Sequence, residues 1–467
     1  MDLAWASATE IAAAIRTRTV SPVEAVRHAL DRIATVNPTL NCFCFVHGDD
    51  AMAAARAAEA AVAAGRPLGS LHGVPIAIKD LTPIKGKRTT LGSKLYEHWV
   101  PDWQPVIVDR LQAAGAIIVG KTTTPEFAMA GFTSSPLWGV TRNPWKPDRS
   151  PSGSSGGSGA AVASGCVPLA EGSDMGGSVR GPASANGLVG LKPSLGRIPC
   201  DLMPTSFDNR MHFGPLARTV DDAALFLNVC KGPHARDIQS LPAIDDVAIP
   251  VVPSLKGRRL ALSVDYGFYA VSDEVTGVLH RAADTLRRHG AVVEPVVLPW
   301  TSELLKVWYD QDNALAVALY GHLLAQSRAD LAPTTIAAIE AGLKVSAADL
   351  RRGEFLRTKL WHELAAVLER YDALIGPTSA IPPPPATGSD LDYYFDGPDG
   401  RYVAVDLTVQ FSLTAQCPVM SVPMGMTADG LPLAMQVVGR RFDDAGLLAL
   451  AAGIEQVLPW RDRHPTI

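Results

Sequence analysis

The chain has 467 residues, 47% of them hydrophobic and 19% charged, which is the composition of a globular protein with a large apolar core. Its formal net charge of −5 at pH 7 and the lack of any long run of one sign argue against nucleic acid as a partner. No apolar run approaches the length of about 18 residues that a membrane span requires, and the N-terminus lacks the basic region of a secretory signal. We therefore expect a cytoplasmic protein that does not enter a membrane.

The six cysteines are too few for a disulfide framework. Cys42 and Cys44 form a C-x-C pair, but no second pair stands at zinc-binding spacing. We expect buried free thiols in a reducing compartment rather than a metal site.

Residues 1–65 are helical in character. The segment Ser-Pro-Val-Glu at 21–24 supplies an N-cap, a proline in the first turn and a glutamate placed for a capping box. Apolar residues then follow at helical spacing until Asn-Pro at 37–38, where we expect this helix to stop. An alanine-rich segment at 51–64 predicts another helix, which the glycine after it closes.

Short apolar strands then alternate with helices. Strands are predicted at 74–80 and 116–119, with the end of a helix at 110–114 between them. The alternation continues with a strand at 260–264 and, beyond it, a helix at 274–289 and a strand at 292–297. This order favours an α/β layer architecture over a helical bundle or a β-sandwich.

The second half of the chain begins with mostly helical residues, 302–371. A strand is predicted at 371–375, and residues 386–403 are rich in aromatic side chains and turns, which makes them a candidate loop over a site. Two further strands, at 418–423 and 432–438, are expected to pair across an Asp-Gly turn.

We see no internal repeat and no linker, so we expect a single domain over residues 1–467. Within it we distinguish an N-terminal helical region (1–65), a catalytic core (66–230), a variable substrate-facing region (231–400), and C-terminal strands and a helix that return to the core (401–467).

Residues 150–190 are the most unusual stretch of the chain. Glycine and serine make up 20 of these 41 residues, a richness that is typical of flexible linkers. Apolar residues stand between them, however, and a linker has no use for so much apolar surface. Small residues beside apolar ones indicate backbone that packs closely, with many N–H groups turned inward. We interpret this stretch as the scaffold of an active site.

Residues 115–122 match the phosphate-binding P-loop pattern letter by letter. A P-loop follows a strand and exposes its N–H groups to phosphate, whereas the four middle residues here are themselves an apolar strand. We therefore predict a strand followed by a turn.

Residues 153–157, Gly-Ser-Ser-Gly-Gly, match the nucleophile elbow G-x-S-x-G, which would make Ser155 the nucleophile of a Ser-His-Asp enzyme. That motif needs a strand immediately before it, but residues 143–151 are broken by prolines. None of the downstream histidines stands in a distinctive setting. These observations disfavour the elbow.

A lysine offers an alternative base. Lys79 ends the apolar strand at 74–80, and its ammonium group would be desolvated in a central strand, which lowers a lysine pKa. A neutral amine is a general base that can activate a serine. The local sequence by itself favours another interpretation, in which Lys79 pairs with the neighbouring Asp80 at the surface.

Residues 174–178, Asp-Met-Gly-Gly-Ser, place a serine after two glycines. Consecutive N–H groups in such a segment can converge on one oxygen as an oxyanion hole. A Gly-Gly pair more often makes an ordinary tight turn.

These blocks together closely resemble the amidase signature family. The family's core motif is similar to residues 152–157, followed downstream by a segment similar to 174–180, Asp-Met-Gly-Gly-Ser-Val-Arg. The resemblance spans nearly the whole chain and implies an α/β/α layered fold with a large mixed central sheet covered by helices. Its other blocks are residues 72–80, 120–122, 126–129, 141–145, 190–193, 214–220 and the C-terminal segment 430–440.

The resemblance also implies roles for individual residues. The family's catalytic lysine falls on Lys79 and its nucleophile on Ser178; the bridging serine, whose peptide bond is cis in the family, falls on Ser154, 24 residues earlier. Lys79 would draw a proton through Ser154 from Ser178, which attacks an amide carbonyl and forms an acyl-enzyme that water cleaves. Neither a metal nor an organic cofactor is needed. The oxyanion donors would be the backbone N–H groups of Met175, Gly176, Gly177 and Ser178.

The implied activity is amide-bond hydrolysis, and apolar residues after the motifs favour a small aryl or alkyl amide, an anilide or a carbamate as substrate. About half of these residues are expected simply to fill the core. Ser152 and Met175 stand where the family usually has glycine and threonine, and both would reshape the pocket wall. The candidate substrate contacts are Met129, Phe132, Trp138, Met203 and Phe207.

The family also contains the glutaminase-type subunit of a tRNA-dependent amidotransferase, which works with partner subunits. That alternative would need an arginine and an acidic residue to bind free glutamine. Residues 205–212 depart from the usual form of that subfamily. Dimers are common in the family, so a homodimer is a further expectation.

Overall fold

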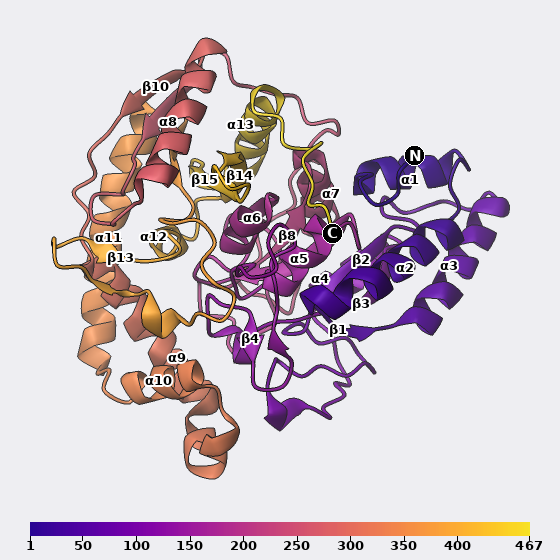
Figure 1. Ribbon diagram of the computed structural model, residues 1–467, viewed down its shortest axis with the longest axis horizontal. Helices are drawn as coiled ribbons and strands as arrows, with labels where there is room; N and C mark the ends of the chain where they lie inside the picture. Colours follow the sequence, from indigo (N-terminus) through magenta and orange to yellow (C-terminus); the bar gives the residue numbers. More distant parts are fainter.

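An 11-stranded mixed sheet crosses the molecule, and helices cover both of its faces (Figure 1). The computed structural model describes residues 1–467 throughout. This is the α/β/α layered architecture that the resemblance implies. In spatial order the strands are β1 (Phe43–Val46), β3 (Ile117–Thr122), β2 (Pro75–Lys79), β6 (Leu169–Asp174), β8 (His212–Ala217), β7 (Val189–Lys192), β14 (Val419–Met426), β15 (Pro432–Val438), β11 (Ala373–Pro377), β9 (Arg259–Leu262) and β10 (Val292–Pro295).

Thirteen α-helices surround the sheet. Apolar side chains of α4, α7, α8 and α13 belong to a buried cluster of 55 residues on one face, and those of α2, α3, α5 and α6 to a cluster of 23 on the other. The helices are α1 (Ala8–Arg16), α2 (Pro22–Leu40), α3 (Gly48–Ala63), α4 (Val106–Ala113), α5 (Gly156–Ala163), α6 (Arg180–Asn186), α7 (Val220–Cys230), α8 (Asp273–Arg288), α9 (Glu303–Ser327), α10 (Pro333–Gly342), α11 (Ala347–Arg370), α12 (Val409–Leu413) and α13 (Asp444–Val457).

The sheet topology gathers several strand ends at one edge. β2 runs parallel to both β3 and β6, with Ala77 opposite Gly120 on one side and opposite Ala170 on the other. Parallel strands end at the same edge of a sheet. Lys79 at the end of β2 and Asp174 at the end of β6 therefore lie at a common edge.

Two expectations for the N-terminal region are wrong. Helix α2 does not stop at residues 37–38 but continues to Leu40, because Pro38 removes only its own N–H, while the N–H of Asn41 still donates to the carbonyl of Asn37 at 2.8 Å. The region also contains a strand, β1, whose four residues pair antiparallel with β3.

The other predicted elements are confirmed in kind. Residues 117–122 form the mostly buried strand β3 rather than a P-loop, but the turn expected directly after the apolar residues is wrong, because the strand continues through Thr122. β14 and β15 pair antiparallel, as expected from the Asp-Gly turn between them. Residues 386–403 carry a 3-10 helix at Asp390–Asp392 and the short pair β12 (Phe395–Asp396) and β13 (Tyr402–Val403) between turns. A second short pair is formed by β4 (Ser134–Ser135) and β5 (Gly139–Val140).

None of the helices has the length and apolar character needed to cross a lipid bilayer. All six cysteines are free thiols, and four of them are fully buried.

Candidate active site

Two turns within residues 150–190 approach the end of β2. The first, residues 152–155, leads into α5, and the second, residues 175–179, joins β6 to α6. Every residue of α5 is buried. A Cβ atom at Gly157 would lie 2.5 Å from the backbone of Thr123, so glycine is required for α5 to pack this closely on the end of β3. The Gly/Ser-rich stretch is thus packed core rather than a linker.

Lys79 reaches the first turn and the end of β6. Its side chain is fully buried, and its Nζ donates hydrogen bonds to Ser154 Oγ at 2.7 Å and to Ser173 Oγ at 2.9 Å. The expectation that Lys79 pairs with Asp80 at the surface is wrong. The Asp80 carboxylate lies 3.0 Å from Lys121 Nζ instead, and the side chains of Asp80 and Lys121 are both fully buried. Neighbouring residues of an extended chain point in opposite directions, so Lys79 and Asp80 have separate partners.

Burial lowers the pKa of Lys79 to about 7, although the nearby carboxylates of Glu171 and Asp174 work against this shift. The Glu171 carboxylate accepts hydrogen bonds from the Lys79 backbone N–H and from Thr82 Oγ1, both at 2.9 Å. Glu171 therefore fixes the end of β2 without contacting the amine. Burial therefore favours the neutral form of the Lys79 amine.

The serines of the first turn differ in their surroundings. The peptide bond between Gly153 and Ser154 is cis, as the resemblance implies. Ser155, the serine of the elbow pattern, is fully buried, and its hydroxyl donates to the carbonyl of Ser173 at 3.3 Å. Ser155 is therefore held away from any substrate.

The serine of the second turn, Ser178, is partly exposed, whereas Ser154 is buried. The backbone N–H of Ser155 donates to the carbonyl of Ser178 at 3.3 Å, which holds the two turns side by side. No hydrogen bond joins the two hydroxyl groups of Ser154 and Ser178 in the structure.

One expected oxyanion donor is already engaged. The backbone N–H of Gly177 donates to Asp174 Oδ1 at 2.9 Å, so this N–H already has an acceptor within the protein. The N–H groups of Met175, Gly176 and Ser178 have no acceptor within the protein. The physical reason is that consecutive N–H groups of a turn do not all point the same way, and Asp174 captures the one that faces inward.

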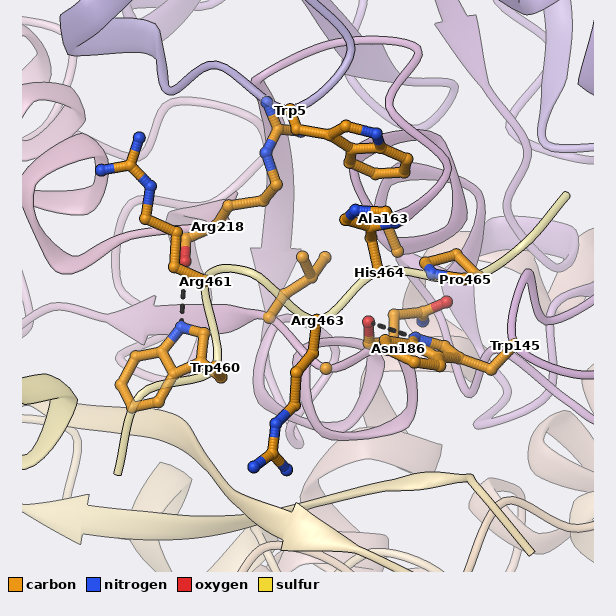
Figure 2. Close-up of a pocket in the computed structure, with 12 residues that line it drawn as sticks. Trp5, Trp145, Ala163, Asn186, Arg218, Trp460, Arg461, Arg463, His464 and Pro465 are labelled. Carbon is orange, nitrogen blue, oxygen red and sulfur yellow. Dashed lines mark hydrogen bonds between the residues drawn. The ribbon is translucent and has the colours of Figure 1, made fainter. Parts of the chain in front are cut away.

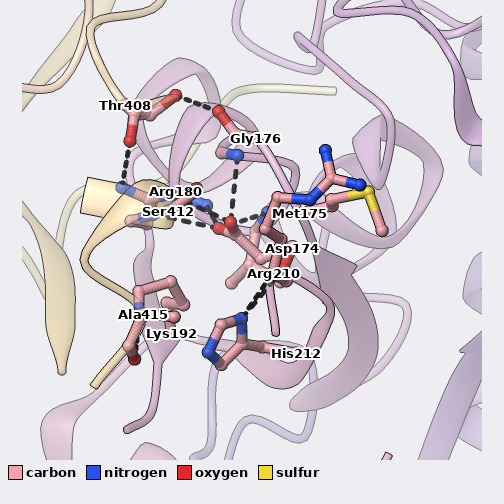
Figure 3. Close-up of polar contacts among 12 residues, drawn as sticks. Asp174, Met175, Gly176, Arg180, Lys192, Arg210, His212, Thr408, Ser412 and Ala415 are labelled. Carbon is pink, nitrogen blue, oxygen red and sulfur yellow. Dashed lines mark hydrogen bonds and ion pairs between the residues drawn. The ribbon is translucent and has the colours of Figure 1, made fainter. Parts of the chain in front are cut away.

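The ion pair between Asp174 and Arg180 holds the second turn in place (Figure 3). Arg180 Nη2 lies 2.9 Å from Asp174 Oδ1, and both side chains are fully buried. Burial raises the pKa of Asp174, but the charge and hydrogen bonds of Arg180 outweigh it and lower the pKa to about 2. Arg180 also donates to the carbonyl of Thr408, to Gln436 Oε1 and to Ser412 Oγ, each at 2.9 Å.

The histidine nearest to this network has no catalytic geometry. His212 Nδ1 lies 2.7 Å from the carbonyl of Arg210, and burial lowers the pKa of the ring to about 3. The imidazole is neutral at pH 7 and contacts backbone rather than a serine (Figure 3). This arrangement speaks against a Ser-His-Asp triad.

The five candidate substrate contacts are dispersed. Phe132 is buried and stacks on Tyr393 with 5.6 Å between ring centroids, and the residue after it, Thr133, donates to the carbonyl of Ser152 at 2.8 Å. The hydrogen bond of Thr133 therefore places Phe132 next to the first turn, residues 152–155. Met129 packs beside a small apolar cluster that contains Phe127.

The other three candidates have different neighbours. Trp138 donates from Nε1 to Thr90 Oγ1 at 2.9 Å and packs edge-on against Phe45 of β1, on the side of the Asp80–Lys121 pair. Met203 lines a small cavity with Cys200 and Met211. The side chain of Phe207 is 79% exposed.

Three residues that contact the lysine or the second turn are not among the candidate site residues named from the sequence. Ser173 accepts from Lys79, Trp308 on α9 donates from Nε1 to the carbonyl of Met175 at 3.4 Å, and Thr408 Oγ1 donates to the carbonyl of Gly176. Trp308 and Thr408 are 133 and 232 residues away from their partners. No local pattern marks such contacts.

A separate cavity lies beneath the C-terminal tail, where Trp5 stacks on His464 with 4.0 Å between ring centroids (Figure 2). Arg218, Arg461 and Arg463 line it, but their guanidinium groups point in different directions, so they do not converge on an anion. The cavity contains neither Lys79 nor the serine turns.

Comparison with known proteins gives a consistent result. The family model described as Amidase matches residues 24–448. The chain is 34% identical over 468 residues to an acylamidase of Rhodococcus erythropolis, covering 99% of this chain and 98% of the relative. It is also 35% identical over 472 residues to a glutamyl-tRNA(Gln) amidotransferase subunit of Thermosynechococcus vestitus, covering 96% of this chain and 97% of the relative.

Solved structures agree. A bacterial aryl acylamidase of the amidase signature family superposes with a TM-score of 0.91 at 30% identity, with 98% of each chain covered. A peptide amidase from Stenotrophomonas maltophilia superposes with a TM-score of 0.85 at 26% identity, with 99% of each chain covered. On these matches, the chain belongs to the amidase signature family and is an amide hydrolase.

Proposed function

We propose that Lys79, Ser154 and Ser178 form the catalytic triad of this amide hydrolase. The observation that carries the proposal is the fully buried Lys79 amine, which donates to Ser154 Oγ at 2.7 Å beside the turn that presents Ser178. A buried amine with a pKa of about 7 is available as a general base at neutral pH.

In the proposed reaction, neutral Lys79 takes a proton from Ser154 as Ser154 takes one from Ser178. Ser178 Oγ then bonds to the amide carbonyl carbon. The proton returns through Ser154 to the leaving nitrogen, the C–N bond breaks, and an amine or ammonia departs. Water next attacks the acyl-enzyme and gives its proton to the same relay; the bond to Ser178 breaks, and a carboxylic acid is released.

The oxyanion that forms during both attacks requires preorganised donors. We assign this role to the backbone N–H groups of Met175, Gly176 and Ser178, the three in the turn that have no acceptor within the protein. Removing one oxyanion donor typically lowers kcat by about 10²- to 10³-fold.

The proposed base makes hydrolysis depend on pH. Because burial lowers the pKa of Lys79 to about 7, kcat/KM is expected to rise as pH increases through about 7 and to level off above it. Below that pKa the amine is protonated and cannot accept a proton. The measurement is kcat/KM for a neutral anilide, whose own charge is constant over this range.

Another nearby group provides the control for this profile. Asp406 accepts from Ser152 Oγ at 3.4 Å, and burial raises its pKa to about 7. In Asp406→Asn the profile keeps its shape if Lys79 is the base. A flat profile in the wild type between pH 6 and 8 would contradict the proposed role of Lys79.

We further propose an apolar aryl or alkyl amide, an anilide or a carbamate as the substrate. Aromatic side chains gather at the two turns: the ring of Trp308 lies 2.5 Å from the position of a Cβ at Gly176, and Tyr309 packs edge-on against it with centroids 5.1 Å apart. From the loop at 386–403, Tyr394 lies over Gly131, which packs directly on Gly153.

The charges near the turns support a neutral substrate. The guanidinium groups of Arg180 and Arg210 are engaged by Asp174 at 2.9 Å and by Asp208 at 2.5 Å. A free carboxylate on a substrate would have to compete with these pairs. The names of the relatives point the same way, since they include an acylamidase and an aryl acylamidase.

The alternative is a glutaminase-type subunit that delivers ammonia within a tRNA-dependent amidotransferase. It is supported by relatives of this chain that are 33–35% identical and bear that name.

A substrate panel separates the two functions. The purified chain, tested without partner subunits, is expected to hydrolyse an anilide or fatty amide with a kcat/KM about 100-fold or more above that for glutamine, because an apolar pocket binds apolar groups and leaves a zwitterion poorly solvated. Release of amine or ammonia is the readout. Preference for glutamine would support the amidotransferase role instead.

A further inference from the structure

The peptide group between Gly176 and Gly177 is held at both ends. Its N–H, on Gly177, donates to Asp174 Oδ1 at 2.9 Å, and its carbonyl, on Gly176, accepts a hydrogen bond from Thr408 Oγ1. In a trans peptide the N–H and the carbonyl point in opposite directions. The hydrogen bonds to Asp174 and Thr408 therefore fix the orientation of this peptide plane from opposite sides.

Thr408 belongs to the same hydrogen-bonded ring as Asp174. It is fully buried, and its carbonyl accepts from Arg180 Nη1 at 2.9 Å. Arg180 in turn pairs with Asp174. The ring runs from Gly177 to Asp174, Arg180, Thr408 and Gly176, and it joins the segment before α12 to the turn that carries the nucleophile (Figure 3).

The packing around Gly177 points to the same contact. Its φ of +130° suits glycine, and a Cβ there would lie 2.0 Å from Thr408 Oγ1. The Thr408 side chain occupies the space that a side chain at 177 would need. Two adjacent glycines are otherwise free to rotate their shared peptide plane, so an external contact has to set its orientation.

The torsions on either side of this plane link the directions of the two neighbouring N–H groups. The orientation of the Gly176–Gly177 peptide is defined by ψ of Gly176 and φ of Gly177, and these two torsions contribute to the direction of the Gly176 N–H relative to that of the Ser178 N–H. The other carbonyls of the turn already have donors, since Met175 accepts from Trp308 Nε1 and Gly177 accepts from the N–H of Gly181 at 2.7 Å. The hydroxyl of Thr408 is the donor to the remaining carbonyl, that of Gly176.

We propose that Thr408 is a positioning residue for the oxyanion hole, acting through its hydrogen bond to the Gly176 carbonyl. The inference rests on the proposed roles of Ser178 and of the Gly176 and Ser178 N–H groups. Thr408 does not touch the substrate; it keeps the two N–H groups directed at the oxygen that becomes negative in the transition state.

The test is Thr408→Val, which keeps the shape of the side chain and removes the hydroxyl. We expect kcat for a neutral anilide to fall about 10- to 100-fold with KM changed by less than about threefold, because the lost interaction acts mainly in the transition state. Thr408→Ser restores the hydroxyl and is expected to recover most of the lost kcat.

The Ki of a boronic acid inhibitor distinguishes a loss of oxyanion binding from a purely structural defect. It forms a tetrahedral anionic adduct on the nucleophile, so its Ki should rise in Thr408→Val by about the factor by which kcat/KM falls. The Ki of the product acid, which is not tetrahedral, should change much less.

Thr414→Val is the matched control. Thr414 is a buried threonine in the same segment, and its hydroxyl donates to the carbonyl of Gln410 at 3.4 Å without contacting the turn. It should retain kcat within about threefold. The proposal is overturned if Thr408→Val keeps wild-type kcat and boronate affinity while Ser178→Ala is inactive; if Ser178→Ala itself retains activity, the proposed nucleophile is wrong instead.

Discussion

Replacing Ser178 with alanine is expected to reduce amide hydrolysis by at least about 10⁴-fold, because loss of the nucleophile removes the acyl-enzyme route entirely. Ser178 is the partly exposed serine of the turn that follows β6, with the N–H groups of Met175 and Gly176 beside it free of acceptors within the protein. Amine release from an anilide, measured with enough enzyme to detect slow turnover, gives the factor. An acyl-enzyme trapped from a slow ester should appear by mass spectrometry in the wild type and be absent from the variant.

Ser155→Ala provides the matched control. Ser155 satisfies the nucleophile-elbow pattern, but it is fully buried and its hydroxyl is used by the carbonyl of Ser173. Losing that long hydrogen bond is expected to change kcat/KM by less than about tenfold. If Ser155→Ala were inactive and Ser178→Ala active, the elbow would be correct and the lysine relay wrong.

The strand that carries Lys79 illustrates how far the sequence could lead. An apolar run that ends in Lys-Asp predicts a buried strand, and the prediction is confirmed because a continuous apolar run is a local property of the sequence. Which partner the lysine takes is not local. The local sequence favoured Asp80 as that partner, whereas Asp80 pairs with Lys121 on the next strand and Lys79 turns to Ser154 and Ser173.

The oxyanion turn shows a second limit. A Gly-Gly-Ser segment predicts a turn with several N–H groups on offer, but not which of them Asp174 will occupy. That outcome depends on Arg180, which holds the carboxylate in place, and on Thr408 from the far end of the chain. Partners so far apart in the sequence are set by the sheet topology, which brings the segment before β14 next to the end of β6.

Helix α2 and strand β1 show a third limit, in which a local rule is applied too strictly. Proline is unfavourable inside a helix because it loses one hydrogen bond and crowds the preceding turn. In the last turn, however, Pro38 still allows Asn41 to donate to the carbonyl of Asn37. The side chain of Asn37 then accepts from the N–H groups of Cys42 and Phe43 at 2.8 Å, which directs the chain into β1.

Replacing each of the two buried lysines on adjacent strands with methionine is expected to have opposite effects: one change mainly abolishes hydrolysis, and the other mainly lowers stability. Lys79→Met should abolish hydrolysis, because no other base contacts Ser154, yet lower the free energy of unfolding by only about 1–3 kcal/mol, since the amine donates to two hydroxyl groups rather than neutralising a contacting carboxylate. Lys121→Met leaves the Asp80 carboxylate buried without its cation and should lower the free energy of unfolding by about 3–5 kcal/mol.

Urea unfolding followed by circular dichroism, with anilide hydrolysis measured on the same samples, distinguishes the two effects. Adding Asp80→Asn to Lys121→Met removes the unpaired charge and should recover part of the lost stability, while no second change near Lys79 should recover hydrolysis. If Lys79→Met retained activity while Lys121→Met lost it without losing stability, the catalytic amine would be the one on β3. The structure favours β2, because Lys121 Nζ is occupied by Asp80 and by Thr89 Oγ1 at 2.6 Å, whereas the amine of Lys79 contacts a serine beside the proposed nucleophile.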